Sequence, residues 1–172
     1  MDLYIGAYHG QSLVSKGIKV VTWGEISHVS LINPIGVTIE AWHKGGVQLS
    51  ETPWVLHTPG TKISLFRLAY NGERVWEKAL KEVGEEYDFK ALLGFIPMLR
   101  QFHKNNKDKW FCSELVSYAC DLNDNRSKYQ ALFNDRVAYH KIDPSYLCSS
   151  PNLFFVTNVH NIAEFHKVLR NY

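Results

Sequence analysis

The chain has 172 residues, of which 45% are hydrophobic and 21% are charged, and its formal net charge is +2. This length and composition are typical of a globular domain with a sizeable core, and we expect a single domain over residues 1–172. The net charge is too small, and the lysines are too scattered, to favour a nucleic-acid-binding protein.

The cysteines and the apolar segments indicate the compartment. Three cysteines cannot all pair, and their spacing matches neither a disulfide framework nor a set of zinc ligands. Residues 1–5 lack the basic and apolar regions of a secretory signal. The longest apolar run, 91–99, is too short to span a bilayer and contains Pro97. We therefore expect a cytoplasmic protein without a membrane span, in which Cys112 stays a free thiol.

The chain begins with a short strand and a helix. Residues 3–8 are rich in β-formers, and Ser12 is suited to cap a helix that runs to about Val21. We expect Leu13, Ile18 and Val21 to face the core.

A β-hairpin follows. Two β-rich segments, 27–32 and 37–42, flank the sequence Asn-Pro-Ile-Gly at 33–36. Asn followed by Pro opens a type I turn, and Gly36 suits the left-handed residue of a three-residue loop. With this loop, His28 is paired with Trp42.

The hairpin has one apolar and one polar face. Strand alternation places His28 and Glu40 on the same face as diagonal neighbours within side-chain reach. A carboxylate beside an imidazole fixes its tautomer and stabilises the imidazolium. The alternative is a solvated face that carries an incidental His and Glu. The other face, which we expect to be core, carries Val29, Leu31, Val37, Ile39 and Ala41.

The remaining elements follow from hydrophobic periodicity and turn residues. We expect strands at 47–49, 62–69 and 153–156, a helix from about 75 to 84, and an apolar helical region to about 102. We also expect polar segments at 105–109 and 124–128, a loop at 143–144, and a terminal helix that contains Ile162, Phe165 and Leu169.

Cys112 begins an amphipathic helix over 112–120, which the polar run 123–125 stops. The positive end of the helix dipole favours a thiolate, so a pKa in the range of roughly 3.5–7.5 is expected, with Cys112 the first thiol to be alkylated. The alternative is that Cys112 is a small buried hydrophobe. Cys120 and Cys148 lack a neighbouring base in the sequence and are expected to be packing residues.

The order His, carboxylate and then Cys at a helix start is the inverse of that in papain. It is accompanied by Ser-His-Val at 27–29, Ile-Glu-Ala at 39–41, Gly-Val at 46–47, Tyr-Asp-Phe at 87–89 and Phe-Cys-Ser-Glu-Leu-Val at 111–116. In this the chain resembles the circularly permuted NlpC-type papain-fold cysteine hydrolases, specifically the YiiX-like branch. Residues 12–16, 143–147 and 150–153 are also similar to that branch, whereas Ile-Gly-Ala at 5–7 replaces its Gly-Asp pair.

This resemblance implies an α+β, permuted papain-like fold in which an antiparallel sheet packs against a central helix that carries the cysteine. By analogy Cys112 is the nucleophile, His28 is the general base and Glu40 orients His28. Papain-type chemistry needs Cys112 and His28 close together. Trp42 and Tyr87 are expected to contact the substrate, and no cofactor or metal is expected.

The implied reaction is cleavage of an amide, isopeptide or ester bond through an acyl-enzyme on Cys112. The partner is then a peptide, isopeptide or acyl-lipid substrate. Three alternatives remain: a lipid acyltransferase that uses the same acyl-enzyme, a non-catalytic binding module on the same fold, and a metal site built from His28, Glu40 and Cys112.

Overall fold

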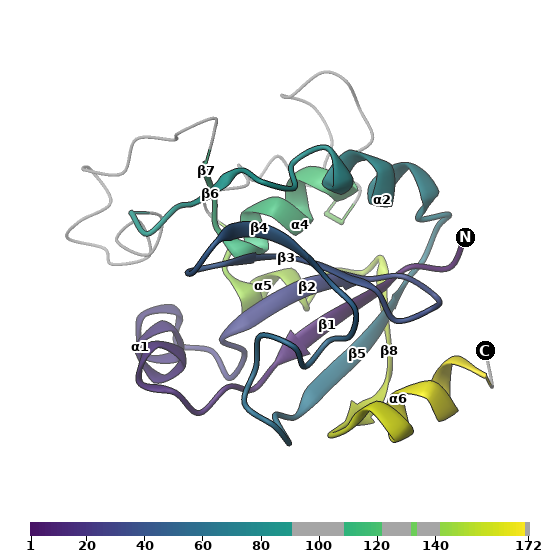
Figure 1. The fold of residues 1–172 in the computed structure, drawn as a ribbon, viewed down its shortest axis with the longest axis horizontal. Coiled ribbons are helices and arrows are strands. Elements are labelled where there is room, and N and C mark those ends of the chain that lie inside the picture. The colour runs from purple at the N-terminus through teal and green to yellow at the C-terminus, as the bar shows by residue number, and fades with distance from the viewer. Residues whose placement is uncertain (91–108, 122–131, 134–141, 171–172) are drawn as a thin grey trace.

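The structure, a computed structural model, describes residues 1–90, 109–121, 132–133 and 142–170. It is a mixed α+β protein with one large antiparallel sheet and a few helices (Figure 1). In spatial order the strands of the sheet are β4 (Gly46–Ser50), β3 (Thr38–Trp42), β2 (His28–Ile32), β1 (Tyr4–Tyr8), β5 (Ile63–Leu68) and β8 (Leu153–Val159). A second, parallel pair joins β6 (Glu86–Tyr87) to β7 (Lys109–Trp110).

The helices lie on both sides of the large sheet (Figure 1). The described helices are α1 (Leu13–Thr22), α2 (Glu73–Leu80), α4 (Cys112–Cys120), α5 (Pro144–Leu147) and α6 (Ile162–Leu169). Helix α4 packs against β2 and β3, and α2 packs against α4. In the described part of the chain, no helix is long and apolar enough to cross a membrane.

The hairpin has the predicted register. Leu31 pairs with Ile39 and Ile32 with Thr38, as the three-residue loop requires. Gly36 has a φ of 93°, the left-handed conformation that the loop needs and that glycine adopts without a steric penalty. The backbone N–H of Asn33 donates a hydrogen bond to the backbone carbonyl of Val37, with an N···O distance of 2.9 Å, and this bond closes the loop.

Each face of the sheet carries its own buried cluster. On the face covered by α4, the cluster contains the predicted core residues Val29, Leu31, Ile39 and Ala41 together with Cys112 and other apolar side chains. The opposite face packs against α6 through Phe165 and includes Tyr4, Tyr8, Ile32, Ile63, Leu65 and Val159. Because both faces are covered, polar side chains of the hairpin are also buried, which rules out the solvated hairpin face considered as an alternative.

Helix α1 begins as predicted, but only two of its three predicted core residues contact the core. The hydroxyl of Ser12 accepts a hydrogen bond from the Ser15 amide, Ile18 is buried and Val21 packs against the core. The expectation for Leu13 is wrong, because its side chain is 87% exposed. Five residues of helix rotate a side chain by about 140°, so Leu13 and Ile18 cannot share a face.

Most of the later elements match their predicted positions. The expected strands are β4, β5 and β8, the expected helices are α2, α4 and α6, and Phe165 is buried. The loop at 143–144 instead caps a short helix, because the Asp143 carboxylate accepts hydrogen bonds from the Ser145 and Tyr146 amides. The predictions for 91–102, 105–108 and 123–128 lie outside the described residues.

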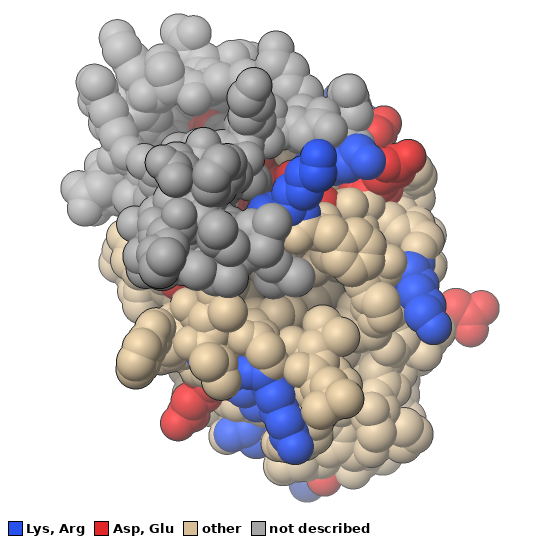
Figure 2. All heavy atoms as spheres, turned by 90° about the vertical axis from the view of Figure 1, so that its left-hand side faces the viewer, with Lys and Arg blue, Asp and Glu red and all other residues tan. Residues whose placement is uncertain are grey.

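Charged groups of both signs are dispersed over the visible face in Figure 2. Lys and Arg side chains occur in small separate groups, and Asp and Glu lie beside several of them. The described part of this face therefore carries no continuous basic stripe of the kind that follows a nucleic-acid backbone.

Substitution of two glycines tests how closely the start of β4 packs against the segment that precedes β6. Gly46 and Gly60 both have positive φ, 73° and 78°. A Cβ on Gly46 would overlap the carbonyl oxygen of Glu85, whereas no atom lies within 4 Å of one on Gly60. We expect Gly60→Ala to lower the free energy of unfolding by about 1 kcal/mol, and Gly46→Ala by more than about 3 kcal/mol. Urea denaturation measures both; equal losses would show that the Glu85 backbone moves away freely.

Candidate active site

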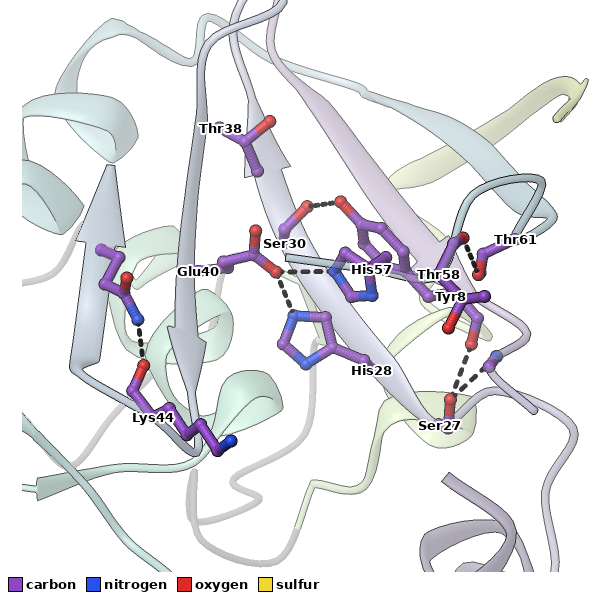
Figure 3. A network of polar contacts seen from close by, with 12 residues as sticks. Tyr8, Ser27, His28, Ser30, Thr38, Glu40, Lys44, His57, Thr58 and Thr61 are labelled. Atoms are coloured by element: carbon purple, nitrogen blue, oxygen red, sulfur yellow. Dashed lines mark hydrogen bonds and ion pairs between the residues drawn. The ribbon is translucent and has the colours of Figure 1, made fainter. Parts of the chain in front are cut away.

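The hairpin brings His28 and Glu40 into direct contact. The Nε2 atom of His28 lies 2.7 Å from Oε2 of Glu40 (Figure 3), so the predicted diagonal pair is a hydrogen bond. His28 is 6% exposed and Glu40 is fully buried. A short, buried contact of this kind between a ring N–H and a carboxylate is a strong hydrogen bond that fixes the imidazole ring.

A second histidine binds the same carboxylate. Nε2 of His57 lies 2.9 Å from Oε2 of Glu40, so both rings point to one oxygen (Figure 3). His57 comes from the irregular segment 51–62 between β4 and β5. His57 was not among the predicted site residues, because its segment has no strand or helix periodicity from which the direction of the side chain could be inferred.

The contacts of Glu40 define the protonation of both rings. Burial raises the pKa of Glu40, but the hydrogen bonds from His28 and His57 outweigh it and lower the pKa to about 2. Glu40 is therefore a carboxylate at neutral pH and can only accept, so both histidines carry a proton on Nε2. When His28 is neutral, its free base is consequently Nδ1. Burial lowers the pKa of His28, against the opposing effect of Glu40.

Cys112 lies at the N-terminus of α4, as predicted, but it is fully buried. Its sulfur accepts backbone hydrogen bonds from Val29 and Ser113. It belongs to the apolar cluster on the face of the hairpin opposite His28, and the described contacts include no hydrogen bond between Cys112 and His28. The structure thus assembles the predicted His28–Glu40 pair, but the predicted contact between Cys112 and His28 is not among the described hydrogen bonds, because the two side chains lie on opposite faces of the hairpin.

The expectation of a lowered pKa for Cys112 is wrong for this buried state. Burial raises the pKa of the Cys112 thiol to about 12, and the backbone hydrogen bonds only oppose that shift. Burial likewise raises the pKa of Cys120 and of Cys148 to about 12. The effect of the helix dipole on the thiol is smaller here than the loss of hydration.

His28 and His57 line a cleft of about 190 Å³ together with Trp42 and Tyr87, the two predicted substrate contacts. The Trp42 ring meets His28 and His57 edge to face, at 5.2 and 4.7 Å between centroids. Burial and the nearby Cys112 both raise the pKa of Tyr87. Tyr87 therefore lies near the thiol as well as at the cleft.

The same cluster is the group of potential metal ligands in the described part of the chain, and it contains His28, Glu40 and His57 rather than Cys112. Tetrahedral ligands about 2.1 Å from a zinc ion lie about 3.4 Å from one another. The observed separations of 2.7 and 2.9 Å are shorter and match charge-assisted hydrogen bonds. The donor set suits a metal, but its spacing fits shared protons better.

No protein-family model matches the chain, and a search of the curated proteins finds no match. The functional assignment therefore rests on the geometry and chemistry of these residues.

The lowered pKa of Glu40 makes its contribution to stability depend on pH. Its ordinary pKa is 4.5 and its folded value about 2, so the stabilisation is complete above about pH 4.5 and is lost as the pH falls toward 2. We expect Glu40→Gln to lower the free energy of unfolding at pH 7 by on the order of 3 kcal/mol, a difference that shrinks at acid pH. Urea denaturation between pH 7 and pH 2.5 measures it. The exposed Glu51→Gln is the control, and a pH-independent loss would contradict the assignment.

Burial also predicts the order in which the thiols react. Cys112 and Cys120 are fully buried, whereas Cys148 is partly exposed. We expect limiting iodoacetamide at pH 7 to label Cys148 first in the native protein, and Cys112 and Cys120 much more slowly, because thiolate character and access both control the rate. Peptide mass spectrometry reads the order. Labelling of Cys112 ahead of Cys148 would show that the thiol is ionised and accessible at rest.

Proposed function

We propose that the protein is a cysteine hydrolase that cleaves an amide, isopeptide or ester bond through an acyl-enzyme on Cys112. The observation that carries the proposal is the buried 2.7 Å hydrogen bond between Glu40 and His28, the latter of which lines a cleft. Two buried polar groups in direct contact at a cleft are the usual arrangement of a general base and the residue that orients it.

The arrangement of the elements also supports a permuted papain-like fold. The cysteine begins a helix that packs against the strands bearing His28 and Glu40, and those strands precede the helix in the sequence. The antiparallel sheet and the chain order are those expected for that fold.

In this mechanism Nδ1 of His28 accepts the proton of the Cys112 thiol. The thiolate attacks the substrate carbonyl carbon, and backbone N–H groups at the start of α4 stabilise the oxyanion. Protonated His28 then gives its proton to the leaving group as the acyl-enzyme forms. Water attacks the thioester with His28 again as base, which releases the acid and restores the thiol. Glu40 stabilises the imidazolium at each stage.

The mechanism requires the thiol to become accessible, since Cys112 is fully buried at rest. His28 is the first residue of β2, and the thiol already accepts a hydrogen bond from the adjacent Val29. The two side chains therefore have to meet around the end of this strand. A thiol with a pKa of about 12 stays protonated until it meets the base, so thiolate forms on contact with His28.

An acyl-enzyme trap tests the proposal. The protein is incubated with a panel of activated acyl esters and N-acyl amides, and intact and peptide mass spectrometry locate any thioester. We expect the acyl group on Cys112, with no adduct in Cys112→Ala and a loss of roughly 1,000-fold or more in turnover. Glu40→Gln should reduce turnover without abolishing it, because an orienting residue contributes less than the nucleophile.

Cys120→Ala is the matched control, because Cys120 lies on the same helix and is equally buried. It should keep the adduct and the turnover of the unsubstituted protein. Acylation on Cys120 or Cys148, or turnover that survives in Cys112→Ala, would contradict the proposed nucleophile.

A further inference from the structure

His57 is held in place by contacts on three sides. Its side chain is 5% exposed and its ring stacks on Tyr8, with centroids 3.9 Å apart and planes at 17°. Tyr8 is itself fixed, because its hydroxyl lies 2.9 Å from the Ser30 hydroxyl and its ring is fully buried. The Trp42 ring also contacts the His57 ring, in a T-shaped arrangement with centroids 4.7 Å apart. A histidine used merely to fill space would not need its N–H directed at a buried carboxylate.

The segment that carries His57 is also ordered by its own hydrogen bonds. The amide of His57 donates to the carbonyl of Trp54 at 3.1 Å, and the indole N–H of Trp54 donates to the carbonyl of Thr61 at 3.0 Å. These bonds fold 51–62 back on itself, so the position of His57 is set by the loop as well as by Tyr8.

The two histidines bind the same oxygen of Glu40. Oε2 accepts both Nε2–H groups, while Oε1 is buried with no hydrogen-bond partner in the described structure. A carboxylate held by one donor alone could rotate and exchange its oxygens. The second donor keeps Oε2 turned toward His28 and shares the negative charge that would otherwise act on His28 alone.

We propose that His57 is a positioning residue for the proposed hydrolase, which acts through Glu40 to fix the tautomer and the basicity of His28. This inference rests on the proposed function for its kinetic consequence, but the hydrogen-bond geometry on which it stands is independent of it.

Several charged or titratable groups face this pair. Glu40 on β3 favours protonated His28, whereas His57 and His43, on the loops after β4 and β3, oppose it, and burial lowers the pKa of His28 further. Tyr8 on β1 packs edge to face against His28, with ring centroids 5.2 Å apart. On helix α4, Cys112 lies close enough to Glu40 for the charge of the carboxylate to raise the pKa of the thiol. Removing His57 should consequently raise the pKa of His28.

Two substitutions separate the hydrogen bond from the packing. His57→Phe keeps a flat ring on Tyr8 but removes the donor, whereas His57→Gln keeps an N–H donor near the position of Nε2 but removes the ring. We expect His57→Phe to lower kcat by roughly 10- to 100-fold, as small misplacements of catalytic groups do. We also expect it to move the acid limb of kcat/KM upward by about half a unit to one unit. His57→Gln should recover most of kcat.

His43→Gln is the control for the loss of a neighbouring histidine, because His43 packs beside Trp42 and has no described bond to Glu40. It should leave kcat unchanged and move the acid limb of kcat/KM less than His57→Phe does, because His43 acts on His28 through its charge alone and not through Glu40. If His57 only fills space, the order reverses: His57→Phe retains activity and His57→Gln loses it, which would overturn the proposal.

A readout without turnover keeps this inference separate from the proposed function. Long-range ¹H–¹⁵N NMR of the histidine side chains gives the tautomer and the pKa of His28 in Cys112→Ala and in the double variant with His57→Phe. We expect an Nε2–H tautomer with a raised pKa when His57 is replaced. An unchanged His28 titration would overturn the role of His57 even if the hydrolase is confirmed. Zinc bound to the purified protein in a 1:1 ratio and lost in both His57 variants would overturn it in favour of a metal site.

Discussion

The buried carboxylate of Glu40 is the constraint on which the rest of the site depends. A carboxylate removed from water is stable only if donors replace its hydration. Here both donors are imidazole N–H groups, from His28 on the neighbouring strand and His57 on the segment between β4 and β5. The register of the hairpin supplies the first donor and the fold of 51–62 supplies the second. The Tyr8 ring stacks on the ring of His57, and the hydrogen bond between the hydroxyls of Tyr8 and Ser30 holds Tyr8 in place.

The large sheet divides the site into two environments. On one face polar side chains are buried in a hydrogen-bonded network, and on the other the Cys112 thiol sits among apolar residues. An apolar surrounding favours the neutral thiol, whereas the network favours an ionised Glu40 and an oriented His28. In the proposed hydrolase, the base His28 would therefore be preorganised at rest, whereas the nucleophile Cys112 would not. For a hydrolase this arrangement links formation of the thiolate to the step that brings the thiol to His28.

Because two histidines share the carboxylate of Glu40, the basicity of His28 also differs from that of a single His–Glu pair. With one histidine, the charge of Glu40 would act on His28 alone and favour the imidazolium. Burial lowers the pKa of His28 and the second histidine lowers it further, which would suit the proposed role of a base that must be neutral to accept a proton near pH 7. The cleft then presents the rings of His28 and His57 with Trp42 and Tyr87, so aromatic side chains enclose the polar pair.

Local sequence rules determined the hairpin, because Asn33-Pro34-Ile35-Gly36 fixes the loop length, the loop length fixes the register, and strand alternation then places His28 beside Glu40. The cap of α1 at Ser12 and the start of α4 at Cys112 follow from equally local signals. Tertiary structure alone decided the rest. His57 reaches Glu40 through a loop without periodicity, packing decided that Ile18 and not Leu13 faces the core, and the Cys112 thiol has a raised pKa. Burial, which depends on every element packed around a residue, outweighs the short-range effect of the helix end.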